Sequence, residues 1–124
     1  MGDILSNEEK TERLQALKSI DAEIKMLQHE AAKVSGIKPK AIYIKSLTAY
    51  RDTLTKRINE LEGIRNEITS AIYKVSDSVL QSLLIKRYIE GKTWQCIADE
   101  LFYSTEHIQM RLHKKALSEI ELQE

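Results

Sequence analysis

The chain has 124 residues and a formal net charge of zero, a length that fits one compact domain or a small domain with a helical extension. Charged residues make up 31% and hydrophobic residues 42%, with one proline and four glycines. This composition predicts long helices and excludes a β-protein, which needs more Val, Thr and aromatic residues. Because the net charge is zero, the chain as a whole does not attract nucleic acid or anionic membranes electrostatically. Such a partner must therefore bind a local patch of basic residues.

The cysteine content and the hydropathy of the sequence indicate where the protein is located. The lone Cys96 excludes an intrachain disulfide and fits a reducing compartment. No apolar run approaches the roughly 20 residues of a membrane span, and the first six residues lack the basic and apolar regions of a signal peptide. We therefore expect a soluble cytoplasmic protein with no membrane partner.

Enzymatic motifs are missing from the sequence. It has no glycine-rich phosphate-binding loop and no CxxC pair, and its Ser, His and Asp residues do not follow the order of a catalytic triad. Cys96 has no partner for nucleophilic catalysis, and His107 and His113 are six residues apart, unlike an i, i+4 metal-binding pair. The sequence predicts a protein that is not an enzyme, with no catalytic residues, no metal and no cofactor.

The first predicted helix begins after Ser6, which forms a capping-box pattern with Glu9. It ends near residues 35–36, and Pro39 lies just beyond. Its apolar positions alternate gaps of three and four residues, the heptad spacing of a helix that packs along its length on another helix. These positions are Leu17, Ile20, Ile24, Leu27, Ala31 and Val34.

The second predicted helix runs from about residue 40 to residue 75 and would be about 54 Å long, too long to stand alone. The short connection favours an antiparallel hairpin of the two helices. Gly63 indicates either a kink or the close approach of another backbone. The apolar stripe, wider than one partner helix covers, predicts a homodimer through the N-terminal helices. It comprises Leu47, Leu54, Leu61, Ile68 and Val75, flanked by Tyr50, Ile58, Ile64 and Ile72.

The pattern breaks at residues 76–78, which predicts a domain boundary at residues 75–78. Residues 1–75 would form the helical hairpin and residues 78–124 a helix-turn-helix domain, so the expected fold is all-α. A capping box of Ser78 with Gln81 would open a supporting helix that stops at Gly91. Thr93 would then cap a helix over residues 94–101, and Ser104 a last helix to about residue 120.

Residues 80–120 resemble the region-4 helix-turn-helix of sigma factors, on the evidence of segments 84–91, 93–98 and 104–117. A helical N-terminal half followed by segments 91–94 and 103–104 resembles, more specifically, the ArpU-type phage transcriptional regulators. The resemblance implies a sequence-specific DNA-binding activator of phage or prophage genes in a Gram-positive host. Two alternatives stay open: a small terminase-like DNA-packaging protein, and a sigma-like module that contacts RNA polymerase.

Base readout is expected from the start of the last helix, which would lie in the major groove of double-stranded DNA. Thr105 could contact a thymine methyl group, Glu106 accept from a cytosine amino group and Gln109 bind adenine through two hydrogen bonds. The resemblance to sigma region 4 also places Glu106 and Gln109 at base- or backbone-contacting positions. Met110 faces outward with them, although a packing role is favoured. The apolar positions that are expected to face inward are Ile108, Leu112 and Ala116.

Phosphate contacts are expected from Arg111, Lys114 and Lys115, with Lys92 contributing from the preceding turn. His107 and His113 complete the set of candidate DNA-binding residues. Residues 105–115 carry three basic residues and one acid, so the intrinsic affinity should be weak.

The predicted motif contains two aromatic residues, Trp94 and Phe102, whose roles are expected to differ. Trp94 is predicted to be a core residue rather than a stacking platform. Helix-turn-helix turns usually carry glycine in the left-handed position, where this chain has Phe102. Phe102 therefore predicts either another turn geometry or a packed ring that offsets the strain.

Overall fold

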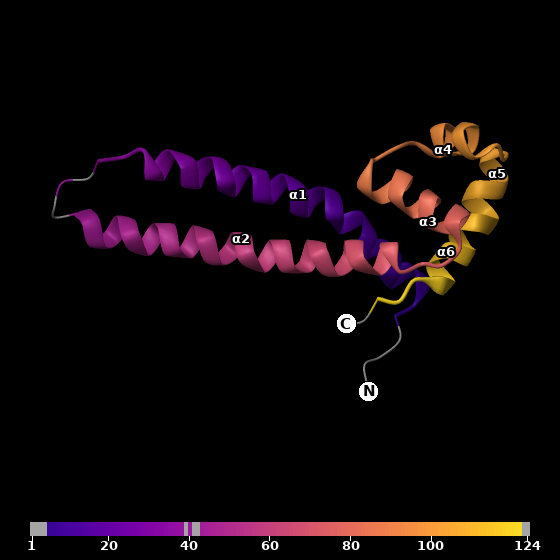
Figure 1. Ribbon diagram of the computed structural model, residues 1–124, viewed down its shortest axis with the longest axis horizontal. Helices are drawn as coiled ribbons and strands as arrows, with labels where there is room; N and C mark the ends of the chain where they lie inside the picture. Colours follow the sequence, from indigo (N-terminus) through magenta and orange to yellow (C-terminus); the bar gives the residue numbers. More distant parts are fainter. Residues whose placement is uncertain (1–4, 39, 41–42, 123–124) are drawn as a thin grey trace. The chain divides into compact units, whose positions relative to one another are not determined.

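The computed structural model describes residues 5–38, 40 and 43–122, and it confirms the all-α class (Figure 1). No strand is present among these residues, and none of their helices is long and apolar enough to cross a membrane. The α-helices are α1 (Asn7–Ser35), α2 (Ile44–Tyr73), α3 (Ser78–Leu84), α4 (Trp94–Leu101), α5 (Thr105–His107) and α6 (His113–Glu119). Two π-helical turns, η2 (Ile85–Ile89) and η3 (Ile108–Leu112), continue α3 and α5.

The chain divides into two compact units, and the division differs from the predicted boundary at residues 75–78. A hairpin unit comprises Ser19–Asn66, and a composite unit combines Met1–Lys18 with Glu67–Glu124. Both long helices therefore pass from one unit into the other. The sequence could not show this division, because the apolar stripes of α1 and α2 run through it without a break. Whether residues 1–75 fold alone stays a prediction.

The start and the end of α1 confirm the prediction. The backbone N–H of Glu9 donates to the Ser6 hydroxyl at 3.2 Å, and the N–H of Ser6 donates to the Glu9 carboxylate at 3.1 Å. These bonds satisfy donors that a helix N-terminus leaves free, and they lower the pKa of Glu9. The helix ends at Ser35, directly before Gly36.

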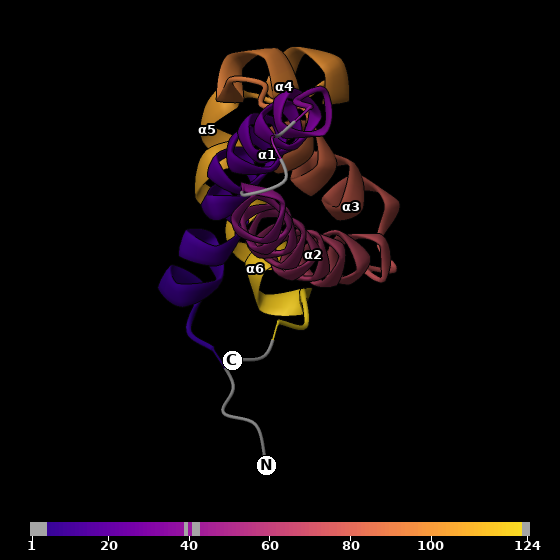
Figure 2. The same cartoon turned by 90° about the vertical axis from the view of Figure 1, so that its left-hand side faces the viewer.

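The hairpin unit is formed by α1 and α2, which lie side by side in both views and run in opposite directions (Figure 1 and Figure 2). Arg57 pairs with Glu23 at 3.3 Å and Arg65 with Asp21 at 3.4 Å, so positions ascend on one helix as they descend on the other. The buried residues include Ile20, Ile24, Val34, Leu54 and Leu61. The flank residues Tyr50 and Ile64 are each 43% exposed, so α1 covers only part of the stripe, in agreement with the prediction that the stripe is wider than one partner helix covers.

Gly63 lies inside α2, and a Cβ built there would have no described atom within 4 Å. Of the two interpretations of this glycine, the close approach of another described part of the chain is therefore wrong.

The composite unit holds the largest fully buried side chains of the described residues. They are Leu14, Leu17, Ile72, Leu80, Leu83, Leu84, Ile97, Ile108 and Ile120. The first turns of α1 belong to this core. Lys10 is only 6% exposed, and its ammonium donates to the backbone carbonyl of Leu117 in α6 at 2.8 Å. Burial of a charged group is tolerated because that hydrogen bond compensates part of its lost hydration.

The predicted capping box of Ser78 with Gln81 is wrong. The N-cap of α3 is Asp77, whose carboxylate accepts from the N–H groups of Val79 at 2.9 Å and Leu80 at 3.1 Å. Asp is as effective an N-cap as Ser. The Gln81 side chain instead donates to the carbonyls of Tyr73 and Val75 at 2.9 and 3.3 Å, where α2 has ended. It thereby satisfies acceptors that a helix C-terminus leaves free.

Both expectations for Phe102 are wrong. The residue adopts the left-handed conformation, with φ 62° and ψ 40°, and its side chain is 93% exposed. The turn therefore has the geometry that favours glycine, and no packing of the ring offsets the strain.

We expect Phe102→Gly to raise the free energy of unfolding by about 1 kcal/mol, since a Cβ in this conformation costs roughly 1–2 kcal/mol and glycine returns part of that as chain entropy. Phe102→Ala, which keeps the Cβ, is the control and should change little. Urea unfolding of the three proteins measures the difference. A loss of stability in both variants would show that the ring itself stabilises the fold.

Candidate nucleic-acid interface

Two side-chain caps fix the helices of the predicted DNA-binding motif, as the sequence predicted. The Thr93 hydroxyl accepts from the N–H of Cys96 at 3.2 Å and opens α4. The Ser104 hydroxyl accepts from the N–H of His107 at 3.1 Å and opens α5. Ile97 and Ala98 of α4 and Ile108 of η3 are all at most 2% exposed, and the two elements pack against each other. The three residues 102–104 connect α4 to α5.

The π-helical turn η3 was not predicted, and it lies in the middle of the proposed recognition helix. The N–H of His113 bonds to the carbonyl of Ile108, five residues back. This wider turn changes the phase of the helix relative to uniform α-helical spacing. Leu112, expected to face inward, is only half-buried, whereas Ala116 and Leu117 are buried.

The candidate base-reading side chains lie at the first turns of this helix. Glu106, Gln109 and Met110 are exposed, and Thr105 is half-buried. The side chains of Glu106 and Gln109 form no hydrogen bond or ion pair within the described part of the chain. Their polar atoms are therefore free to meet the hydrogen-bonding edges of bases.

The candidate phosphate-binding cations follow on the same helical stretch. Arg111, Lys114 and Lys115 are exposed, and among the described residues none of them pairs with a carboxylate. Their spacing of three and four residues places them on neighbouring positions of the helix surface. The structure therefore brings together six of the ten predicted site residues as exposed groups on one stretch of helix.

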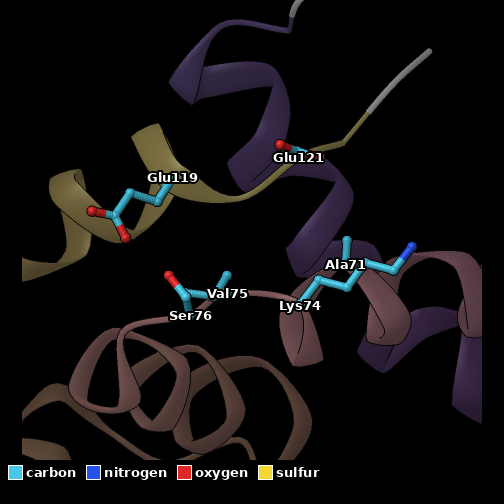
Figure 3. Close-up of a pocket in the computed structure, with 6 residues that line it drawn as sticks. All are labelled: Ala71, Lys74, Val75, Ser76, Glu119 and Glu121. Atoms are coloured by element: carbon cyan, nitrogen blue, oxygen red, sulfur yellow. The ribbon is translucent and has the colours of Figure 1, made fainter.

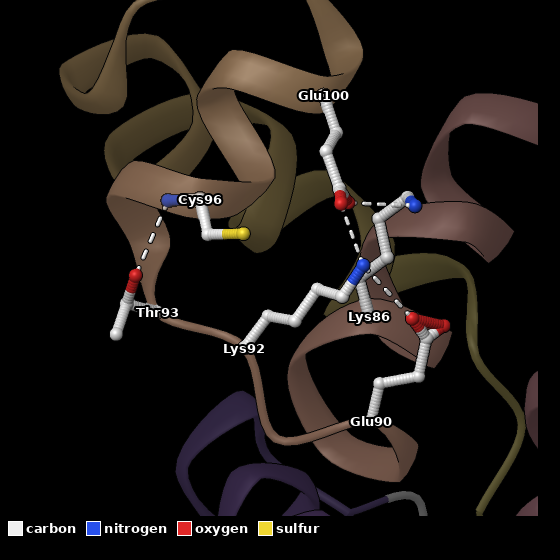
Figure 4. A network of polar contacts seen from close by, with 6 residues as sticks. All are labelled: Lys86, Glu90, Lys92, Thr93, Cys96 and Glu100. Atoms are coloured by element: carbon white, nitrogen blue, oxygen red, sulfur yellow. Dashed lines mark hydrogen bonds and ion pairs between the residues drawn. The ribbon is translucent and has the colours of Figure 1, made fainter.

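Lys92 is held differently, in a network that joins the end of η2 to α4 (Figure 4). Its ammonium lies 2.6 Å from the Glu100 carboxylate and 3.2 Å from that of Glu90, while Lys86 lies 2.8 Å from Glu100. The hydrogen bonds that Lys92 donates to Glu100 and Glu90 raise its pKa. Hydrogen bonds from Lys86 and Lys92 lower the pKa of Glu100. Lys92 is thus paired with two carboxylates, one of them shared with Lys86, and is not part of the phosphate-binding set proposed below.

His113 is also occupied inside the composite unit. Its Nε2 lies 2.6 Å from the Tyr88 hydroxyl, and its ring meets the edge of Trp94 at 4.7 Å between centroids. Burial, followed by the nearby Arg87 charge, lowers the pKa of His113 to about 4. The ring is therefore neutral at pH 7 and can accept from Tyr88. A neutral ring gives no ionic contact to phosphate, so His113 leaves the proposed set.

Two further aromatic side chains take part in packing. Trp94 is half-buried, with the Arg87 guanidinium carbon 4.3 Å from its ring centroid, in line with packing rather than base stacking. His107 is half-buried and stacks on Tyr103 at 5.2 Å.

The lowered pKa of His113 predicts a pH dependence of stability. In the unfolded chain this group titrates near pH 6.5, so between pH 6.5 and 4 the unfolded state binds more protons. The free energy of unfolding should fall over this window by about 2 kcal/mol, a figure reduced because part of the ring stays solvated. Chemical unfolding at pH 7.5, 5.5 and 4.5 measures it. The same fall in His113→Gln would assign it to other groups.

A cleft of about 310 Å³ lies between the end of α2 and the end of α6 (Figure 3). It is lined by Ala71, Lys74, Val75, Ser76, Glu119 and Glu121. No hydrogen bond or ion pair joins the side chains of its lining residues, so the cleft holds no nucleophile paired with a base. No group of three or more metal-ligating side chains occurs within the described ranges.

Comparisons of the chain with models of protein families, with curated proteins and with solved structures found no match. The fold and the contacts above are therefore the basis for any assignment of function.

Proposed function

We propose that the protein is a sequence-specific DNA-binding transcriptional regulator, an activator of phage or prophage genes in a bacterial host. The helix from Thr105 would enter the major groove of double-stranded DNA with its N-terminal turns toward the bases. Glu106 and Gln109 would read base edges, and Arg111, Lys114 and Lys115 would contact phosphates.

One observation carries this proposal. The exposed Glu106 and Gln109 side chains, which no described residue binds, adjoin three unpaired cations on a single stretch of helix. Elsewhere in the composite unit, Lys10, Lys86 and Lys92 donate to carbonyls or carboxylates. Sequence-specific DNA binding requires exposed hydrogen-bonding groups that contact base edges and neighbouring cations that contact phosphates.

A selection from random double-stranded DNA tests the proposal, because the operator sequence has to be found first. Arg111→Ala and Lys114→Ala should weaken binding to selected and random DNA alike, each flattening the salt dependence by about one unit. Gln109→Ala and Glu106→Ala should cost about 1–3 kcal/mol at the selected site only. The two sets differ because phosphates are alike in every sequence and base edges are not.

Lys92→Ala is the matched control, since that cation is already paired with two carboxylates. It should leave the salt dependence unchanged. The absence of any enriched sequence, or unchanged binding in all four variants, would contradict a role for this helix in DNA recognition. A large ring seen by light scattering would favour the terminase-like alternative over a promoter-bound regulator.

We further propose that the regulator is a homodimer that uses the exposed sides of α1 and α2. Met26 and Ile64, 62% and 43% exposed, would be covered in such a dimer. Dimerisation would compensate for the small number of cations on each recognition helix. Sedimentation should show a dimer at tens of micromolar that Ile64→Glu dissociates, and a monomeric wild-type protein would exclude it.

Phe102 supports a second candidate function, contact with RNA polymerase by a sigma-like module. The backbone of Phe102 is strained, and its exposed ring does not stabilise the fold described above. Aromatic side chains are frequent in protein interfaces. Phe102→Ala should then reduce binding to purified polymerase without changing binding to DNA.

A further inference from the structure

The tip of the hairpin unit carries an apolar surface that the hairpin leaves uncovered. The Arg51 guanidinium donates to the carbonyl of Val34 at 3.1 Å, so position 51 of α2 lies beside the last turn of α1. Helix α1 ends at Ser35, whereas α2 extends back to Ile44. About two turns of α2 therefore continue past the end of the partner helix, as Figure 1 shows.

The overhanging turns carry the apolar stripe with them. Tyr43, Leu47 and Tyr50 recur at spacings of four and three, and with Ile37 and Ser46 they line an open cleft of about 340 Å³. Ile37 and Tyr43 are 51% and 60% exposed. Further along α2, the same stripe continues in Leu54 and Leu61, which are buried in the hairpin. The cleft is thus the uncovered end of a helix-packing surface.

The charge around this cleft is mostly basic, with the Glu30 carboxylate, which accepts from the Tyr50 hydroxyl at 3.3 Å, as an acidic group at its edge. Residues 31–51 contain five basic residues and no acid, in a chain whose net charge is zero. Lys33, Lys38, Lys40 and Lys45 are exposed. None of them forms an ion pair within the part of the chain that the structure describes. A second copy of the same tip would bring like charges together, which opposes a symmetric contact there.

We propose that the tip of the hairpin unit binds an acidic amphipathic helix of a partner protein. The apolar residues of the partner helix, spaced at i, i+3 or i+4 and i+7, would pack on the tip as α1 packs on Leu54 and Leu61. Its carboxylates would meet the lysines around the cleft. A concave apolar surface selects such a helix over duplex DNA, which offers phosphates and no apolar ridge to fill the cleft.

The test uses the full-length protein and a displayed library of 18-residue amphipathic helices. The library keeps a fixed leucine stripe and varies the flanking positions among Glu, Gln and Lys. We expect selection to enrich Glu at the flanks. The enriched peptides should bind Tyr43→Glu and the double variant Lys38→Glu/Lys45→Glu at least tenfold more weakly than the wild type, measured by fluorescence anisotropy.

The control variants are Tyr73→Glu and Lys56→Glu, which place the same changes on α2 away from the tip and should leave peptide binding unchanged; Tyr73 is 60% exposed, as Tyr43 is. Circular dichroism shows that each variant is folded, and Tyr43 is exposed enough that its replacement spares the core. Enrichment of Lys, no enrichment, or binding that both tip variants retain would overturn the proposal. Tip-dependent binding of phosphatidylserine vesicles or of a 20-base-pair DNA duplex, without peptide enrichment, would overturn it as well.

Discussion

A fragment of residues 78–124 is expected to have no stable fold, although it contains every helix of the proposed DNA-binding motif. In the whole chain, the core around Leu83 and Leu84 also contains Leu14, Leu17 and Ile72, which the fragment lacks. The hydrogen bond from Lys10 to the Leu117 carbonyl would be lost as well. At roughly 1.5–3 kcal/mol for each large apolar side chain removed from the core, the loss is comparable to the whole stability of a small domain.

The matched experiment keeps the composite unit and removes the hairpin. Asp21 pairs with Arg65, so Lys18 and Glu67 lie close together on neighbouring helices. A Gly/Ser linker of about five residues, with a mean span on the order of 12 Å, can join them. The shortened chain should unfold cooperatively in urea, whereas fragment 78–124 should show weak helical circular dichroism. A fragment that melts cooperatively would restore the predicted boundary at residues 75–78.

Local sequence signals predicted the helices well. The caps at Ser6, Thr93 and Ser104 were found because each hydroxyl acts within three residues of its own position. The apolar spacing predicted both long helices and the all-α class for the same reason. Asp77 was missed because three polar residues in succession, 76–78, offered several caps of nearly equal quality.

Contacts between distant residues could not be predicted in the same way. The pairing of Lys10 with Leu117 joins positions 107 residues apart. Lys92 looked like a free cation in the sequence, because its bond to Glu100 depends on the turn after η2 that folds residue 92 back toward α4. His113 looked outward on a uniform α-helix, whereas the structure places it against Tyr88 and Trp94. Such assignments need the tertiary structure, and they reduced the candidate site from ten residues to its exposed members.

Leu14→Asp should destabilise the composite unit by about 4 kcal/mol or more, although residue 14 is far in sequence from the helix-turn-helix. Leu14 is fully buried, so the substitution removes an apolar side chain and places a carboxylate in the core. The measurement is the free energy of unfolding in urea, monitored by the circular dichroism of the whole chain. Loss of DNA binding should accompany the loss of fold.

Gln15→Asp is the control for this substitution, because residue 15 is the next position of the same helix and is exposed. It should change the free energy of unfolding by no more than about 0.5 kcal/mol. Leu14→Ala should fall between the two, at about 2–5 kcal/mol for a cavity in a packed core. If Leu14→Asp proved as mild as Gln15→Asp, the first turns of α1 would not belong to the core of the DNA-binding unit. Fragment 78–124 would then be expected to fold, so the two experiments test the same packing from opposite ends of the chain.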